Sequence, residues 1–188
     1  GYPVTNRRTA LVGMIALMLL VNIGFYFVPI DYSILGDYAV AGVFGITALA
    51  TATIVIPVPY IPVIMHIAQQ YHDMHMLVWI ALAAGAGSVV GEISGYMVGR
   101  TGRQAFAETR FSRWVATQMT HPVRAFLALF ALSAPPNPLF DVAGIAAGAF
   151  GVPFWLFATA VFSGRFVRML GIVLAGYYAL GLVLYYTI

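Results

Sequence analysis

Five stretches of the chain are almost wholly apolar, and short polar segments separate them. The stretches 9–28 and 76–99 are each as long as the roughly 20 residues that a helix needs to cross about 30 Å of hydrocarbon. A third stretch, 152–187, is longer than one crossing requires, which favours one long helix that is tilted or bent. We predict that these three stretches span a membrane.

The two remaining apolar stretches, 37–72 and 122–150, are each divided by a cluster of prolines. Proline removes a backbone donor and breaks a helix. Broken backbone is tolerated at membrane depth only where protein buries it or water lines it. We therefore predict that each stretch is a re-entrant helical hairpin. The prolines expected to shape the two tips are Pro57, Pro59 and Pro62 in the first and Pro135, Pro136 and Pro138 in the second.

The arginines decide whether 37–72 turns back or crosses. Arg7 and Arg8 favour a cytoplasmic N-terminus, since positive residues concentrate on that side. A hairpin at 37–72 then keeps the arginine-containing linker 100–121 in the cytoplasm, whereas a crossing would place it outside. The two hairpins thus enter from opposite sides, the inverted-repeat plan of many transporters. The linker, with aromatic residues among its arginines, is predicted to be an amphipathic helix at the headgroup surface.

Composition agrees with lipid as the solvent, because 62% of the residues are hydrophobic and only 8% are charged. Soluble proteins carry about 25% charged residues. The net charge of +3 is small and no basic aromatic stripe is present, so we expect no nucleic-acid partner. Without cysteine or a recognisable nucleophile and base, we expect no enzyme activity, no metal and no cofactor.

Taken together, these features predict an all-α polytopic membrane protein, a helical bundle with two inverted re-entrant hairpins and an amphipathic linker helix. Residues 1–188 form a single membrane domain. We place it in the plasma membrane of a prokaryote, with a cytoplasmic N-terminus and scope for a homo-oligomer.

Three charged side chains lie within the predicted spanning helices. Glu92 lies in 76–99, while Arg165 and Arg168 are three residues apart and project from one helix face. Such residues are costly in lipid and mark functional sites or buried pairs. The arginines are either a relay for a lipid phosphate, which guanidinium groups bind in bidentate fashion, or partners of Glu92 and Asp141 that hold the fold.

Polar residues also flank the second proline cluster. Asn137, the exposed backbone amides and the positive end of the following short helix favour an anion. Asp141 either belongs to this pocket or caps that helix. Arg100 and Arg124 border the cytoplasmic side and complete the predicted route.

Four motifs in this order resemble those of the DedA/VTT superfamily, also called SNARE-associated Golgi proteins. Residues 91–102, GEISGYMVGRTG, resemble the signature G-[DE]-x-x-G-Y-x-x-G-R-x-x-G. Residues 135–148 resemble the second re-entrant loop of the archaeal and Golgi-type branch, and 57–59 lies where the first loop carries prolines. Residues 175–181 are similar to the terminal G-Y-x-x-x-G. The motif residues are Gly91, Tyr96, Gly99, Gly144, Gly148, Gly176 and Tyr177.

The resemblance covers roughly residues 40–181 and implies movement of lipids between leaflets. Bacterial members look like translocases of undecaprenyl phosphate, and eukaryotic relatives look like phospholipid scramblases. We therefore expect flippase-type or scramblase-type translocation of a phosphate-bearing lipid, such as a polyprenyl phosphate or phospholipid, through a polar groove at the midplane. A proton-coupled transporter of a small solute or ion is the first alternative. A membrane scaffold that transports nothing is the second.

Overall fold

The protein, seen in a computed structural model, is helical throughout the part of the chain that the structure describes. The described residues are 31–52, 59–71, 73–102, 110–135 and 139–187, with part of 12–28. The predicted spanning helix 9–28 therefore lies largely outside the described residues. Three helices are long and apolar enough to cross a membrane: Ile34–Ala52, Met74–Thr101 and Phe154–Ala179.

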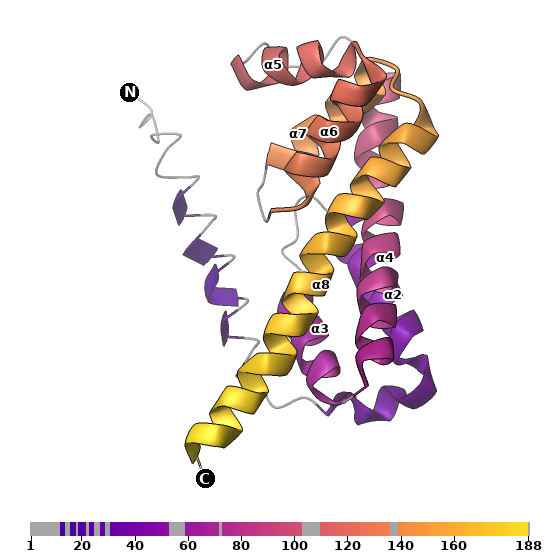
Figure 1. The fold of residues 1–188 in the computed structure, drawn as a ribbon. Helices are drawn as coiled ribbons and strands as arrows, with labels where there is room; N and C mark the ends of the chain where they lie inside the picture. The colour runs from indigo at the N-terminus through magenta and orange to yellow at the C-terminus, as the bar shows by residue number, and fades with distance from the viewer. Residues whose placement is uncertain are drawn as a thin grey trace.

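Two long helices form the frame of the molecule. They are antiparallel, and each runs most of the length of the bundle, as Figure 1 shows for α4 and α8. The short helices occupy the two ends of this frame. In chain order the elements are the 3-10 helix η1 (Tyr32–Tyr38), α2 (Ala39–Ala52), α3 (Tyr60–Gln69), α4 (Met74–Thr101), α5 (Arg110–Met119), α6 (Pro122–Ser133), α7 (Leu139–Ala149) and α8 (Phe154–Thr187).

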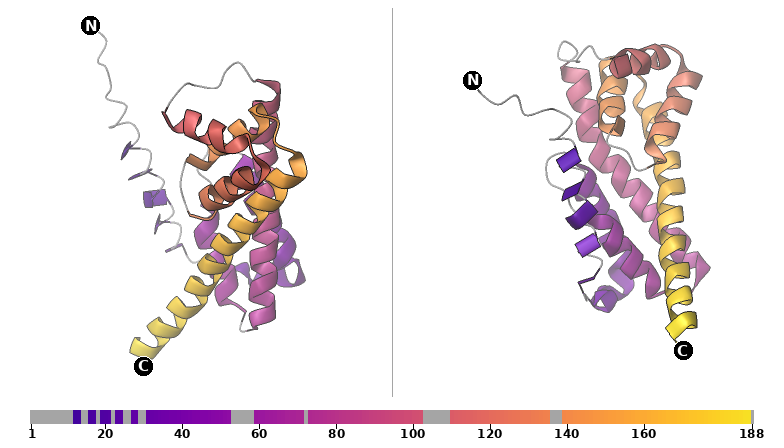
Figure 2. Two further views of the ribbon diagram at one scale, coloured as in Figure 1. Left: turned by 45° about the horizontal axis from the view of Figure 1, so that its top comes forward. Right: turned by 90° about the vertical axis from the view of Figure 1, so that its left-hand side faces the viewer.

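The short apolar helices form two pairs that pack in the same manner. In each pair, the first member packs on the long helix that follows it in the chain: α2 on α4, and α6 on α8. The second member packs on the other long helix: α3 on α8, and α7 on α4. The pairs lie at opposite ends of the frame (Figures 1 and 2). This exchange is the packing expected of two structural repeats of opposite orientation.

Glycines on the long helices allow the first member of each pair to approach closely. A side chain at Gly87 of α4 would collide with Thr47 of α2, and one at Gly164 of α8 would collide with Ser133 of α6. Both neighbours are buried residues with a short hydroxyl side chain. Small residues give membrane helices this close contact, because lipid supplies no hydrophobic force between them.

A second glycine on each long helix receives the second member of the opposite pair. Gly99 of α4 faces the backbone of Ile145 in α7, and Gly176 of α8 faces Met65 in α3. A Cβ at Gly176 would lie 3.2 Å from the Cα atom of Met65. On each long helix, the glycine that contacts the first member of one pair is twelve positions before the glycine that contacts the second member of the other pair. The two halves of the molecule therefore share one packing scheme.

The apolar core is divided into two clusters, one at each end of the frame. The cluster near α6 and α7 includes Leu129, Phe157 and Val161. The cluster near α2 and α3 includes Ile64 and Met169. Glu92 of α4 and Arg165 and Arg168 of α8 lie between these clusters along the two long helices.

Helix α5 lies across one end of the bundle (Figure 1). Its apolar side packs on α6 and α7, where Val115 is fully buried and Met119 is nearly so. Its arginines Arg110 and Arg113 are exposed. The helix is amphipathic, as the linker sequence predicts, and protein covers part of its apolar side, while Trp114 remains exposed beside the arginines.

The glycine contacts can be tested with a matched pair of substitutions on α4. Gly99→Ala should lower the free energy of unfolding by about 1–3 kcal/mol, because the new methyl group meets the backbone of α7. Gly95→Ala should leave stability unchanged or slightly higher, since its Cβ would lie 4.0 Å from Ile145 and alanine favours a helix. Thermal unfolding in detergent measures both. Equal effects of the two substitutions would contradict the packing scheme.

The antiparallel frame also predicts which ends of the molecule share a compartment. The chain has no cysteine, so His75→Cys and Thr117→Cys each introduce a single exposed thiol, near the start of α4 and on α5 respectively. In oriented vesicles, a membrane-impermeant maleimide should label the two positions from opposite sides. Labelling of both from one side would mean that α4 does not cross.

Candidate functional site

A buried ion pair joins the two long helices. Nη2 of Arg165 in α8 donates to Oε1 of Glu92 in α4 across 2.6 Å. Glu92 is 5% exposed and Arg165 is 6% exposed. The distance is typical of a strong, charge-assisted hydrogen bond. The structure thus shows one of the pairings that the sequence suggested.

The pair lies about one third of the way along both long helices, measured from the end of the bundle that α5 covers. Glu92 is nine residues before Thr101, the end of α4, and a rise of 1.5 Å per residue makes this about 14 Å. Arg165 is eleven residues after Phe154, the start of α8, or about 17 Å from the same end of the bundle. Half the thickness of the hydrocarbon core is about 15 Å, so a hydrocarbon boundary at this end of the helices would place the pair close to the bilayer midplane.

Arg168 extends this polar layer by one helical turn. It interacts electrostatically with Glu92, with Arg165 and with Tyr60, the first residue of α3. Its Nε atom is buried and has no hydrogen-bond partner in the described part of the chain. Arg168 as a whole is half-buried, so part of this side chain is accessible while its Nε–H lacks an acceptor.

The sequence analysis missed Ser88, which belongs to the same layer. Ser88 is fully buried, and its Oγ atom has no hydrogen-bond partner among the described residues. It precedes Glu92 by four residues, so both project from one face of α4. That spacing was the available signal, but a serine in an apolar helix is too common to be singled out by it.

Tyr96 connects α4 with the turn between α7 and α8. Its hydroxyl donates to the carbonyl of Val152 at 2.6 Å and accepts from Nη1 of Arg100 at 2.9 Å. The ring stacks on Phe157 with a centroid distance of 4.8 Å. Gly151, in the turn, has a φ of 71°, a conformation that favours glycine. Tyr96, about one helical turn from Glu92 along α4, therefore fixes this turn at one end of the bundle, and Arg100 of the same motif bonds the tyrosine hydroxyl.

The remaining predicted site residues are distributed as follows. Arg124 is exposed in the first turn of α6. Asn137 lies outside the described residues, and Asp141 lies in α7 with a side chain that is also outside the described part. Of the predicted site residues whose side chains are described, the structure brings together Glu92, Arg165 and Arg168.

The predicted hairpin prolines fall partly within the described chain. Pro59 immediately precedes α3, and Pro62 is buried in its first turn. Pro135 is exposed just after α6. The others, Pro57, Pro136 and Pro138, lie outside the described residues.

The other motif glycines take part in helix packing. Gly91 faces Thr51 of α2, Gly148 faces the carbonyl of Tyr96, and Gly144 is buried beside Phe157. Gly176 accepts a hydrogen bond from Nε2 of Gln69 at 3.3 Å, while the neighbouring Tyr177 packs against the core near α3.

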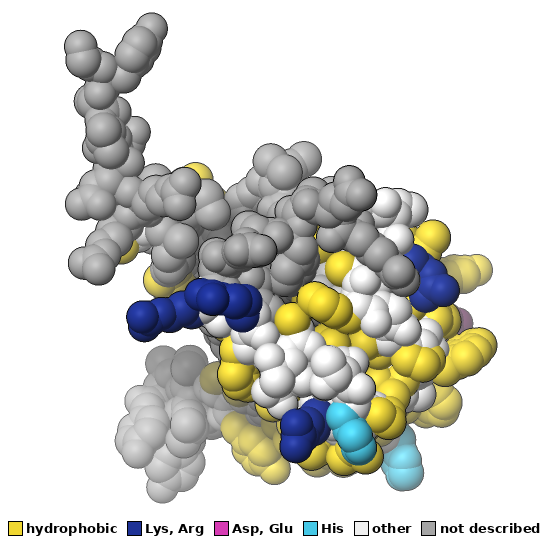
Figure 3. Space-filling view, turned by 90° about the horizontal axis from the view of Figure 1, so that it is seen from above, with side chains coloured by type: hydrophobic (Ala, Val, Ile, Leu, Met, Phe, Trp, Pro, Cys, Tyr) yellow, Lys and Arg dark blue, Asp and Glu magenta, His cyan; other side chains and the backbone are white. Residues whose placement is uncertain are grey.

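The exposed charges separate between the two ends of the bundle. Exposed arginines surround the end covered by α5, where Figure 3 shows several of them with histidine nearby. Among the described residues, the exposed acids Asp37 and Asp73 lie toward the opposite end, where Asp73 caps α4 by accepting from the backbone amide of His75. The arginines at the first end are Arg100, Arg110, Arg113 and Arg124.

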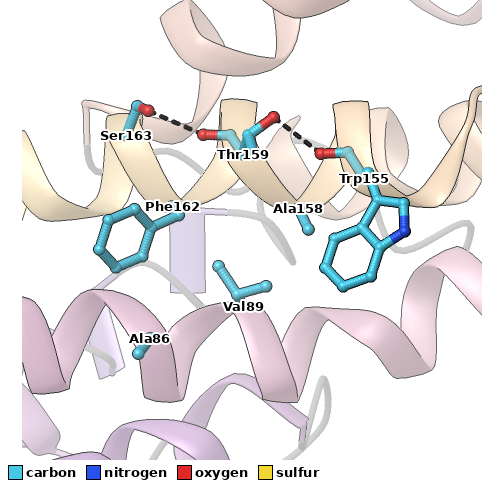
Figure 4. A pocket seen from close by; sticks show the side chains of 7 residues that line it. All are labelled: Ala86, Val89, Trp155, Ala158, Thr159, Phe162 and Ser163. Carbon is cyan, nitrogen blue, oxygen red and sulfur yellow. Dashed lines mark hydrogen bonds between the residues drawn. The ribbon is translucent and has the colours of Figure 1, made fainter.

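An open groove of about 340 Å³ lies between α4 and α8. Its two hydroxyl groups bond within their own helix, Ser163 to the carbonyl of Thr159 at 2.8 Å and Thr159 to that of Trp155 at 2.7 Å (Figure 4). The groove therefore presents an almost wholly apolar surface, which suits a hydrocarbon chain and not a headgroup. It is lined by Ala86, Val89, Trp155, Ala158, Thr159, Phe162 and Ser163.

Comparison with known proteins identifies several relatives. The chain is 33% identical to a vacuole membrane protein 1 homolog of Dictyostelium discoideum, over 47% of this chain and 28% of the relative. It is 32% identical to vacuole membrane protein KMS1 of Arabidopsis thaliana, over 45% and 25%. It is 30% identical to human vacuole membrane protein 1, over 43% and 25%. The matches thus cover about a quarter of the length of these relatives, and no solved structure matches the chain significantly.

The VTT domain matches residues 58–178, well over half of the chain. This match begins just before α3 and includes α4, the second short pair and most of α8. It therefore includes the ion pair, the unpartnered Arg168 and the glycine contacts of both long helices. The chain belongs to the VTT domain family of the DedA/VTT superfamily and is a multi-pass integral membrane protein with distant homology to vacuole membrane protein 1.

Proposed function

We propose that this protein moves a phosphate-bearing lipid, such as a polyprenyl phosphate or a phospholipid, between the two leaflets of its membrane. The observation that carries the proposal is the buried ion pair of Glu92 and Arg165, with Arg168 beside it. We place this pair near the bilayer midplane. A charged headgroup meets its highest barrier at this depth. Arginines placed there lower that barrier, because they replace the water that the phosphate has lost. Membership of the VTT family supports this function, since its members are implicated in lipid scrambling.

The short helix pairs are proposed to be re-entrant hairpins whose tips approach this layer from opposite sides. Helix α3 has 10 residues and α7 has 11, so each covers only about 15–17 Å, or half of the hydrocarbon core. The proximity of Tyr60, at the start of α3, to Arg168 supports the position of the first tip. Exchange of the hairpins between the long helices supports the inverted-repeat plan.

The apolar groove between α4 and α8 supports separate paths for the hydrocarbon tails and the headgroup of the lipid. Hydrocarbon tails remain in lipid or rest in the groove. The hydroxyl groups that line the groove already bond carbonyls of their own helix, so they present no free polar group to a tail. The headgroup passes on the side of the long helices where the ion pair lies. By the positive-inside rule, the arginine-rich end with α5 faces the cytoplasm of a prokaryotic plasma membrane. The transport step needs no covalent chemistry, so the protein is proposed not to be an enzyme.

The ion pair provides the test, provided that folding and transport are separated. Arg165→Gln alone leaves a buried acid without this partner and should lower stability by about 3–5 kcal/mol. The double variant Glu92→Gln and Arg165→Gln removes both charges and should melt close to the unmodified protein. Its rate of lipid exchange in reconstituted vesicles should fall at least about tenfold, the effect of losing one charge-assisted hydrogen bond. Arg113→Gln, on the exposed side of α5, is the control.

Three assays on the same vesicles distinguish the proposal from its alternatives. Lipid exchange of the unmodified protein, with a labelled phospholipid or polyprenyl phosphate, supports translocation. Uptake of a soluble ion or solute without lipid exchange would favour the proton-coupled transporter. If the folded double variant retains biological activity while changes in 100–121 destroy it, the scaffold is favoured.

A further inference from the structure

We propose that Arg168 and Ser88 together hold the phosphate group of the lipid as it passes the midplane. This inference rests on the proposed function and names the part of the site that contacts the headgroup. Neither residue has a partner for its buried polar atom in the described part of the chain, and both belong to the layer that contains the ion pair.

The first step of the argument is the charge of the layer. Glu92 and Arg165 neutralise one another through their 2.6 Å contact. Arg168 adds a second positive charge, so one negative and two positive side chains leave a net charge of +1 among the described residues. Arg168 is half-buried with a fully buried Nε atom, and a cation so placed within an apolar bundle favours an anion or strong hydrogen bonding. The described layer therefore lacks one acceptor group of negative charge.

The second step is the level of Ser88 and Arg168 in the bundle. Because α4 and α8 are antiparallel, moving back four residues from Glu92 and forward three residues from Arg165 leads toward the same end. The displacements are about 6 Å and 4.5 Å along the two axes. Ser88 and Arg168 therefore lie at nearly the same depth, each one turn from the ion pair.

The third step is the chemistry of the unpartnered atoms. The serine hydroxyl can donate one hydrogen bond, and the guanidinium Nε–H can donate another. A phosphate presents several acceptor oxygens and at least one negative charge, so it satisfies both donors and the surplus charge together. A sugar or choline group, in contrast, would not neutralise Arg168.

Access to this pair requires a rearrangement, since Ser88 is fully buried. Tyr60, the first residue of α3, interacts electrostatically with Arg168, so we expect access through a movement of this short helix. The structure thus shows a closed arrangement, in which the buried hydroxyl of Ser88 is not accessible to a headgroup.

Binding of defined ligands to the purified full chain tests the inference apart from transport. Dioctanoyl phosphatidic acid, dioctanoylglycerol and inorganic phosphate are compared by calorimetry in detergent. Ser88→Ala and Arg168→Gln should each weaken phosphatidic acid binding about tenfold or more, because each removes a donor to a charged group. Ser94→Ala on the exposed side of α4 and Arg113→Gln on α5 are matched controls that should bind as the unmodified protein does.

Melting temperatures should not fall, since the unpartnered atoms of Ser88 and Arg168 lose no hydrogen bond and an uncompensated polar group is removed. If Arg168→Gln fails to fold, Arg168→Lys keeps the charge but loses the planar fork and should also weaken binding. The inference is overturned if folded Ser88→Ala and Arg168 variants bind like the unmodified protein, or if dioctanoylglycerol binds as tightly as phosphatidic acid. Equally tight binding of inorganic phosphate would reassign the site to free phosphate.

The experiments distinguish failure of the proposed phosphate site from failure of the proposed function. Lipid exchange that persists unchanged in both variants would refute the inference and leave the proposed function standing. Phosphatidic acid binding that depends on Ser88 and Arg168, in a protein that exchanges no lipid, would refute the proposed function and leave the binding site standing.

Discussion

The contact between Glu92 and Arg165 is the constraint around which the molecule is organised. It joins two long helices at the depth where isolated charges are least tolerated, and it divides the apolar core into two clusters. Each cluster is built from small and aliphatic residues that pack one helix pair on the frame. Because neither charge can be left alone in lipid, the pair fixes the register of α4 against α8. The same contact concentrates polarity where the proposed translocation of a headgroup would require it.

The second organising feature is the repeated use of glycine. Each long helix carries two glycines twelve positions apart, one for the first helix of its own pair and one for the second helix of the other pair. This exchange ties the halves together without a large interface of bulky side chains. It also leaves the polar layer of Glu92, Arg165 and Arg168 between the two apolar clusters along the long helices. Packing and a midplane site thus follow from one arrangement.

The apolar lengths and the proline clusters predicted most of the helical elements, because hydrocarbon thickness and the loss of the proline amide act locally. Glu92, Arg165 and Arg168 were also predictable, since charge in an apolar helix is rare. The role of Tyr96 was not, because its hydroxyl bonds a turn more than 50 residues away, and the role of Arg100 depends on that tyrosine, whose hydroxyl it bonds. The packing of α5 against α6 and α7 could not be predicted either. An amphipathic sequence pattern shows that a helix has an apolar side but not whether protein or lipid covers that side. Ser88 gave no signal of its own.

A double-mutant cycle on Glu92 and Arg165 tests the central claim most directly. The free energy of unfolding is measured in one lipid or detergent system for the unmodified protein, Glu92→Gln, Arg165→Gln and the double variant. If the two side chains form a buried pair that fixes the helices, their coupling free energy should be about 2 kcal/mol or more, within the range found for contacting charged residues. A coupling free energy below about 0.5 kcal/mol, the value typical of residues that do not interact, would contradict the account.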